Sequence, residues 1–341
     1  MATKTEEPQP TILIVGAELG GVMLGVLLEK ANIPYTILER STTVKPPGSA
    51  MSIGGTLFLL FDQLQILDEF VTVVKHSTQS TIENESGETL LTTDYTPLRE
   101  LTGYKGYIPA RPRLYELLLK QIPAHKIHFG KRILTIIKNK DDDNVHIQTA
   151  DGTKYQGDIL VGADGAYSAI RQRLYERLRA QSILSKSDEE DMPFSCTCLV
   201  GQTNELDPKQ FQHLNNTENA FITTLGTDKP YSCALFSTFD KRVYFMVIHH
   251  LDRTMSRAVQ ELRFRSSEKS EWGPYAAQTM CDETRDFPIS IGTGKMTLGN
   301  LYDRIPKELI SKVMLEEKVF TTWHSGRTHA TKFILLEDKA L

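Results

Sequence analysis

The chain opens on an apolar strand that runs directly into a glycine turn, and this junction restricts the fold more than any other feature. Thr11–Val15 reads TILIV, Gly16–Gly21 reads GAELGG, and an acid, Glu39, follows eighteen residues later. Such a turn lets the backbone approach a pyrophosphate, the next helix presents N–H donors, and the acid accepts hydrogen bonds from a ribose. The pattern predicts a strand–helix–strand unit that holds a dinucleotide.

One position departs from the usual pattern, because Glu18 stands where a second glycine is normally found. If the Glu18 side chain points away from the turn, the phosphate site is intact. If it points inward, the carboxylate repels the pyrophosphate and occupies space that the glycine leaves for it. The sequence leaves both orientations open.

Composition excludes several other classes of function. The 341 residues are 40% hydrophobic and 24% charged, as in a globular protein. The net charge is −4, so the protein has no positive electrostatic field that would attract a nucleic acid. No Cys-x-x-Cys pair occurs, which argues against a metal site or a disulfide framework. No apolar run is long enough for a signal core or a transmembrane segment, and we expect an intracellular, cytoplasmic protein. The cysteines are Cys196, Cys198, Cys233 and Cys281.

The remaining segments indicate an α/β protein with a second sheet. The apolar run Asp158–Gly162 extends the parallel sheet, and Ser80–Leu91 alternates around a Ser86-Gly87 turn, as a hairpin does. From about Gln181 the chain is rich in aromatic and β-branched residues, which predicts an antiparallel sheet. Its strands are expected at 194–201, 220–225, 231–239 and 242–251, and a helix is expected over Pro306–Glu317.

Two further motifs follow in the order that one known family requires. Arg111-Pro-Arg-Leu114 opens a helix, and Asp158–Arg171 reads DILVGADGAYSAIR, an apolar strand ending in an Asp-Gly turn. With the glycine turn, these segments resemble the FAD-dependent monooxygenases of the p-hydroxybenzoate hydroxylase fold, especially the fungal secondary-metabolite branch. The resemblance covers nearly the whole chain and implies a three-layer, Rossmann-like FAD-binding domain with an interleaved antiparallel substrate domain.

The glycine pattern and the resemblance together predict which residues contact the cofactor. In that family the arginine at the start of this helix contacts the flavin nucleotide, and the resemblance implies this role for Arg111. The Asp-Gly turn lies where the flavin and the nicotinamide cofactor approach each other, and the resemblance implies this position for Asp164. The segment Gly48–Ser52 resembles the family's loop that passes the cofactor, and the backbone of Ser52 is expected to contact the cofactor there. Taken singly, each residue favours a structural role: Arg111 a surface arginine at a helix N-terminus, and Asp164 an N-cap of the helix near Ser168 or part of an Asp-Gly turn. The expected cofactor-binding residues are Gly16, Gly20, Gly21, Glu39, Arg40, Ser52, Arg111, Asp164 and Gly165.

The domain boundaries and the C-terminal region are further expectations. We place the FAD-binding domain at 8–79 and 106–180, returning at about 291–341, and the substrate domain at 80–105 and 181–290. The family's third flavin motif, Gly-Asp before a helix, follows a Trp-x-x-Gly-Arg segment, which here is Trp323–Arg327. The strand expected at Phe333–Leu336 leads instead into Glu337-Asp338. The chain thus resembles a C-terminally truncated family member; a truncated gene model, a frameshift after Arg327 and a naturally shortened protein are the alternatives.

The resemblance implies an enzyme that uses FAD, with NAD(P)H as co-substrate, to hydroxylate or epoxidise a small aromatic, terpenoid or polyketide metabolite. No catalytic acid or base and no metal ligand stands out, and the oligomeric state is open. Two alternatives remain: a truncated, non-catalytic remnant that binds FAD weakly or not at all, and a nicotinamide-dependent dehydrogenase without a flavin.

Overall fold

The structure is a computed structural model in which the chain divides into two compact units. It describes residues 9–43, 50–138, 144–219, 221–252, 256, 274–306, 309–316, 318–325 and 328–330. The first unit takes the described residues of 1–46, 115–192 and 318–341, and the second takes those of 47–114 and 193–317. Each unit is therefore assembled from segments that are far apart in the sequence. The expected domain boundaries stay a prediction.

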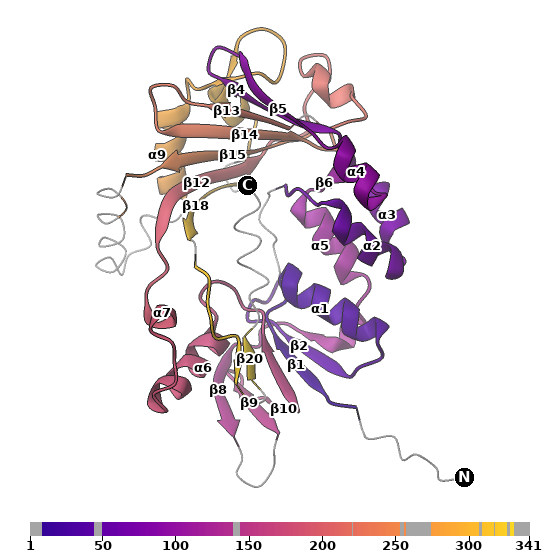
Figure 1. The fold of residues 1–341 in the computed structure, drawn as a ribbon, viewed down its shortest axis with the longest axis vertical. Coiled ribbons are helices and arrows are strands. Elements are labelled where there is room, and N and C mark those ends of the chain that lie inside the picture. The colour runs from indigo at the N-terminus through magenta and orange to yellow at the C-terminus, as the bar shows by residue number, and fades with distance from the viewer. Residues whose placement is uncertain are drawn as a thin grey trace. The chain divides into compact units, whose positions relative to one another are not determined.

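A parallel sheet forms the centre of the first unit (Figure 1). Strand β1 (Ile12–Val15) pairs in parallel with β2 (Tyr35–Leu38) on one side and with β11 (Ile159–Gly162) on the other. Helix α1 (Leu19–Lys30) connects β1 to β2, which confirms the predicted strand–helix–strand unit. The full order is β19-β20-β11-β1-β2-β7, with β7 at Ile127–His128, β19 at His324–Ser325 and β20 at Thr328–Ala330.

Two different layers cover the faces of this sheet. On one face, Leu13, Leu38 and Leu160 pack against Ile147 of a small antiparallel sheet. On the other face lies α1, where a Cβ added to Gly25 would come within 2.9 Å of the Cδ1 of Ile37. The absence of a side chain at Gly25 thus lets the helix and the strand approach closely. The small sheet consists of β8 (Ile133–Lys138), β9 (Val145–Thr149) and β10 (Lys154–Gly157).

The segment 318–325 is fastened to helices α6 (Ala169–Ala180) and α7 (Lys186–Glu189). The carboxylate of Asp188, which is only 4% exposed, accepts hydrogen bonds from the backbone N–H and the hydroxyl of Thr321 and from the N–H of Thr322. The hydroxyl of Tyr175 donates to the Thr322 carbonyl at 3.2 Å. The chain then returns to the parallel sheet, where β20 pairs with β11.

The second unit is built on a mixed sheet with the order β18-β12-β15-β14-β13-β4-β5 (Figure 1). The hairpin predicted around Ser86-Gly87 is present as β4 (Gln79–Asn84) and β5 (Thr89–Asp94), and Gly87 has a φ of +82°. The pairs from β12 to β13 are antiparallel, as expected. These strands are β12 (Phe194–Gln202), β13 (Phe221–Leu225), β14 (Tyr231–Ser237) and β15 (Val243–His250).

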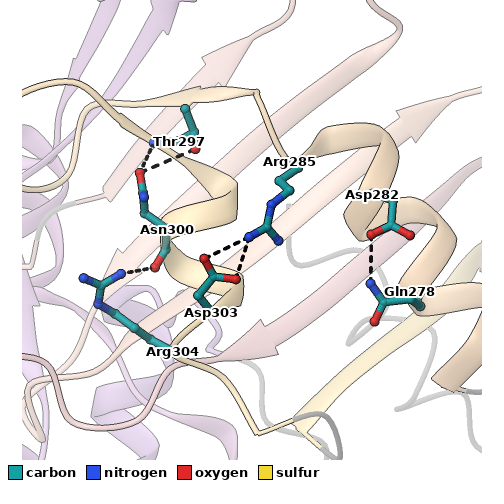
Figure 2. Close-up of polar contacts among 7 residues, drawn as sticks. All are labelled: Gln278, Asp282, Arg285, Thr297, Asn300, Asp303 and Arg304. Atoms are coloured by element: carbon teal, nitrogen blue, oxygen red, sulfur yellow. Dashed lines mark hydrogen bonds and ion pairs between the residues drawn. The ribbon is translucent and has the colours of Figure 1, made fainter.

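Helices α9 (Pro274–Thr284) and α10 (Leu298–Tyr302) pack on one face of the sheet through Met280 and Leu301, which share a core with Phe245. Figure 2 shows the polar side chains around these helices. The guanidinium of Arg285 donates to both carboxylate oxygens of Asp303, at 2.7 and 2.9 Å. The Arg285–Asp303 contact joins the end of α9 to the end of α10, and the Thr297–Asn300 capping box closes the start of α10.

The opposite face of the sheet carries Phe236 and Tyr244, which form a core with Ala50, Ile108 and Ala110. A neighbouring aromatic cluster joins Phe58, Phe61, Phe70 and Tyr107. The aromatic cluster comes from α2 (Gly55–Gln63), α3 (Leu67–Val71) and β6 (Gly106–Ile108). The same region contains β3 (Lys75–Ser77) and α4 (Thr96–Thr102), and it is followed by α5 (Arg111–Leu119), which continues into the first unit.

Two expectations about the second unit were wrong. The predicted helix at Pro306–Glu317 is a strand over Ile310–Glu316, β18, which pairs with the edge of β12. The backbone hydrogen bonds between β18 and β12 outweigh the local helical spacing of the apolar residues in this segment. In addition, β4 pairs with β13 in parallel. The predicted antiparallel sheet thus contains one parallel pair, since β4 arrives from a distant part of the chain and not by a hairpin.

Among the described residues, no helix has both the length and the apolar character needed to cross a membrane. The expected strand at Phe333–Leu336 and the acids Glu337 and Asp338 lie outside the described residues, as do Gly326 and Arg327.

We predict that Asp188→Asn destabilises the protein by about 1–3 kcal/mol at neutral pH, because a buried carboxylate that accepts three hydrogen bonds is lost. Burial alone would raise the pKa of Asp188, but its bonds to Thr321 and Thr322 outweigh burial and lower it. A carboxyl with a lowered folded-state pKa stabilises the fold above its unfolded pKa, and this contribution is lost as the pH falls.

Urea unfolding at several pH values measures this effect. The difference between the native protein and the Asp188→Asn variant should shrink as the pH drops below the ordinary aspartate range. The exposed neighbour Asp191 supplies the control, since Asp191→Asn should change stability by less than about 0.5 kcal/mol. An equal effect of both variants would contradict the anchoring role of Asp188.

Candidate functional site

The turn after β1 is closed too tightly for any side chain. Gly16 has a φ of +106°, and a Cβ there would lie 2.1 Å from the carbonyl oxygen of Ala163. A Cβ on Gly21 would lie 2.0 Å from the carbonyl oxygen of Gly16. Glycine is therefore required at both positions, and the turn packs directly on the residues that follow β11.

Helix α1 begins directly after this turn. The first intrahelical hydrogen bond runs from the Val22 N–H to the Glu18 carbonyl at 2.9 Å. The N–H groups of Leu19, Gly20 and Gly21 precede it and have no acceptor within the helix, so the helix N-terminus offers donors to an anion. Glu18 is the N-cap residue, with an extended backbone and a partly exposed side chain that makes no capping hydrogen bond.

Glu39 ties the end of β2 to the glycine turn. Its carboxylate is 7% exposed and accepts a hydrogen bond from the Ala17 N–H and another from the Ser41 N–H, each at 2.8 Å. A carboxylate has about four lone-pair sites, so two oxygens that each accept one N–H keep capacity for ribose hydroxyls. Arg40, the next residue, is exposed.

Asp164 and Gly165 lie between β11 and α6. The carboxylate of Asp164 accepts hydrogen bonds from the Ser168 hydroxyl and from the Ala169 N–H, and the Ser168 hydroxyl in turn caps the Arg171 N–H. Gly165 has a φ of +94°. The N-cap residue of α6 is therefore Ser168 and not Asp164; the carboxylate of Asp164 binds the first N–H of the helix from the preceding turn and is partly exposed.

Ser52 and Arg111 lie in the second unit. The segment around Ser52 runs antiparallel to the segment that leads into α5, because Met51 donates to the Pro109 carbonyl and Ile53 to the Tyr107 carbonyl. Arg111 is the first residue of α5 and is partly exposed. This register places Ser52 opposite Ile108, three residues before Arg111. Gly48, which begins the expected cofactor loop, lies outside the described residues.

Tyr115 is a candidate that the sequence reasoning missed. Its side chain is 3% exposed, and its hydroxyl is buried without a hydrogen-bond partner among the described residues. Burial, and to a smaller extent the negative charges of Glu18 and Glu39, raise the pKa of Tyr115, so the hydroxyl is neutral. Its position four residues after Arg111 places both on one helix face, a signal that was available in the sequence.

The structure thus gathers most predicted residues at one edge of the parallel sheet. Gly16, Gly20, Gly21, Glu39, Arg40, Asp164 and Gly165 all follow the carboxyl ends of β1, β2 and β11, where ligands of such sheets bind. Ser52 and Arg111 belong to the other unit. Within the part of the chain that the structure describes, no group of three or more His, Cys, Asp or Glu side chains could hold a metal ion.

Two observations show that this edge suits a dinucleotide. The glycine turn leads into the first N–H groups of α1, which have no acceptor within the helix, and the buried hydroxyl of Tyr115 has no partner among the described residues and interacts electrostatically with Glu18 and Glu39. A buried hydroxyl without a partner is costly unless a ligand or an ordered water satisfies it. The residues present therefore fit FAD.

Comparison with known proteins agrees with this geometry. A family model described as FAD binding domain matches residues 9–290. The chain is 26% identical over 326 residues to the FAD-dependent monooxygenase paxM of Penicillium paxilli, covering 94% of this chain and 63% of that protein. It is 25% identical over 337 residues to the FAD-dependent monooxygenase nvfK of Aspergillus novofumigatus, covering 98% of this chain and 65% of that protein. The chain therefore spans just under two thirds of these relatives.

Solved structures show the same fold at lower identity. Klebsiella pneumoniae HpxO complexed with FAD and uric acid superposes with a TM-score of 0.68 at 18% identity, covering 94% of this chain and 72% of that one. The 2,6-dihydroxypyridine-3-hydroxylase of Arthrobacter nicotinovorans gives a TM-score of 0.65 at 13% identity, covering 95% of this chain and 76% of that one.

We predict that Glu39→Gln destabilises the fold by about 1.5–3 kcal/mol, because two hydrogen bonds to a buried charge are weakened and the amide NH2 faces an N–H donor. Denaturant unfolding without added ligand measures the loss. Glu176→Gln is the control, since its exposed pair with Arg173 should contribute less than about 1 kcal/mol. Equal stability of the two variants would show that Glu39 does not hold the turn.

Proposed function

Because the chain belongs to the family of FAD binding domains, we propose that the protein is a FAD-dependent monooxygenase that uses NAD(P)H to hydroxylate or epoxidise a small organic metabolite. The observation that carries the proposal is the glycine turn at Gly16 and Gly21, which lies within the matched residues and leads directly into the N–H donors at the start of α1, where a pyrophosphate would bind. The names of the fungal relatives support monooxygenation as the reaction.

Bound FAD supplies the redox chemistry, accepting a hydride from NAD(P)H and activating molecular oxygen for transfer to the substrate. The chain's own residues bind and orient it. In this proposal the N–H groups at the start of α1 hold the pyrophosphate, and Glu39 accepts hydrogen bonds from the adenosine ribose. The neutral hydroxyl of Tyr115 donates a further hydrogen bond to the cofactor.

We assign Arg111 to a contact with the flavin nucleotide and Asp164 to the place where the flavin and the nicotinamide approach each other. We assign Ser52 to a backbone contact with FAD. The aromatic face of the mixed sheet, with Phe221 and Phe236 stacked at 4.5 Å between ring centroids, is assigned to the substrate side. Its apolar residues would exclude water from an aromatic, terpenoid or polyketide substrate.

The first test is direct titration of the purified protein with FAD, followed by flavin fluorescence. We expect saturable, one-to-one binding and FAD-dependent oxidation of NADPH or NADH. Arg111→Ala should weaken FAD binding by about tenfold or more, because a hydrogen bond from a charged group is worth about 1.5–3 kcal/mol. Arg113→Ala is the matched control on the same helix and should bind FAD like the native protein.

A colourless protein that leaves the fluorescence of added FAD unchanged would overturn the proposal. Binding of NAD(P)H alone, with an Arg111→Ala variant of full affinity, would indicate a flavin-free dehydrogenase.

A second prediction concerns Tyr115→Phe. Removing a buried, unpartnered hydroxyl should leave the stability of the ligand-free protein unchanged or slightly higher, while FAD affinity falls by about fivefold to tenfold. Tyr175→Phe should behave oppositely, because the Tyr175 hydroxyl bonds the Thr322 carbonyl: stability falls by about 1 kcal/mol and FAD affinity stays the same. Thermal unfolding and FAD titration of both variants test this crossed pattern. Native FAD affinity in Tyr115→Phe would remove Tyr115 from the site.

A further inference from the structure

Three polar side chains meet on the mixed sheet of the second unit, outside the cofactor residues. They are Cys196 on β12, His250 on β15 and Ser232 on β14, strands that lie side by side (Figure 1). Cys196 and His250 are direct cross-strand partners, so their side chains share one face of the sheet. The Sγ of Cys196 lies 3.6 Å from the Nδ1 of His250, and the Oγ of Ser232 lies 3.0 Å from its Nε2.

This arrangement gives the imidazole two distinct contacts. Ser232 is only 5% exposed, so its hydroxyl has a defined position beside the Nε2 atom of His250. When the Nε2–H donates to the Ser232 hydroxyl, the lone pair of Nδ1 faces the thiol of Cys196. A base that is held in this way beside a nucleophile is the geometry that activates a thiol.

The four cysteines of the chain all lie in described residues, and their surroundings differ. Cys196 is partly exposed, whereas Cys198, Cys233 and Cys281 are buried. Burial raises the pKa of Cys198 to about 12 and that of Cys281 to about 11, and it raises the pKa of Cys233 as well. These three thiols are protonated and shielded, and they serve as internal references for Cys196.

We propose that Cys196 is a reactive thiol that exchanges with small disulfides, with His250 as its base. The Sγ proton passes to Nδ1 of His250, and the sulfur attacks one sulfur of the incoming disulfide. A new Sγ–S bond forms as the old S–S bond breaks, and the leaving thiolate takes the proton back from His250. One thiol and one disulfide are consumed and one of each is produced, so no further oxidant is needed.

The site goes beyond the monooxygenase function and does not depend on it. Cys196, His250 and Ser232 all belong to the second unit, and none of them is among the residues assigned to the cofactor. Failure of FAD binding would therefore leave this proposal intact, and the reverse also holds.

The test is thiol–disulfide exchange of the folded, full-length protein at one neutral pH. Ellman's reagent gives the rates, and oxidised glutathione followed by intact mass and peptide mapping gives the position. We expect one fast thiol, located at Cys196, that reacts about tenfold or more faster than the cysteines of the urea-unfolded chain. The fast phase should disappear in Cys196→Ser and persist in the matched variant Cys198→Ser.

His250 is tested separately, because its exposed position lets it be replaced without unfolding the sheet. His250→Gln should slow the fast phase by about tenfold, while the thermal midpoint stays that of the native protein. The proposal is overturned if the fast thiol maps elsewhere, if Cys196 reacts no faster than the unfolded chain, or if His250→Gln reacts at the native rate.

Discussion

The close approach of the turn at Gly16 to the end of β11 is the contact on which the first unit depends. The carbonyl of Ala163 stands where a Cβ of residue 16 would be, so β1, β11 and α1 can converge only through glycine. Glu39 adds the third strand by binding the Ala17 N–H from the end of β2. Three parallel strands therefore end at one edge, and the groups suited to a dinucleotide meet there because the backbone packs so closely.

The mixed sheet of the second unit shows how one scaffold carries faces of different character. One face is covered by α9 and α10 around Phe245, and the other carries the aromatic residues Phe236 and Tyr244. Because side chains alternate along each strand, Cys196 and His250 are carried to the same face while the next residues point away. The Cys196–His250 contact can thus form near the ends of β12 and β15, while the central residues of the same strands pack in the core.

Local patterns predicted the elements with the strongest periodicity. Helix α1 is present between β1 and β2 as expected, and so is the hairpin at Ser86-Gly87, since both depend on residues that are neighbours in the sequence. The strand β18 was predicted as a helix, because its partner β12 lies more than a hundred residues earlier and no local signal reports that pairing. The parallel pair of β4 and β13 escaped prediction for the same reason.

By itself, the sequence determined the strand–turn–helix unit, the kind of ligand it suits and the glycines that this requires, because these follow from local steric limits and from charge. Only the tertiary structure decided that the hydroxyl of Tyr115 is buried without a partner among the described residues, where Glu18 and Glu39 act on it electrostatically, and that Cys196 meets His250. Those contacts join residues from separate elements. They exist only once the chain has paid its conformational entropy and packed its sheets, so no spacing in the sequence encodes them alone.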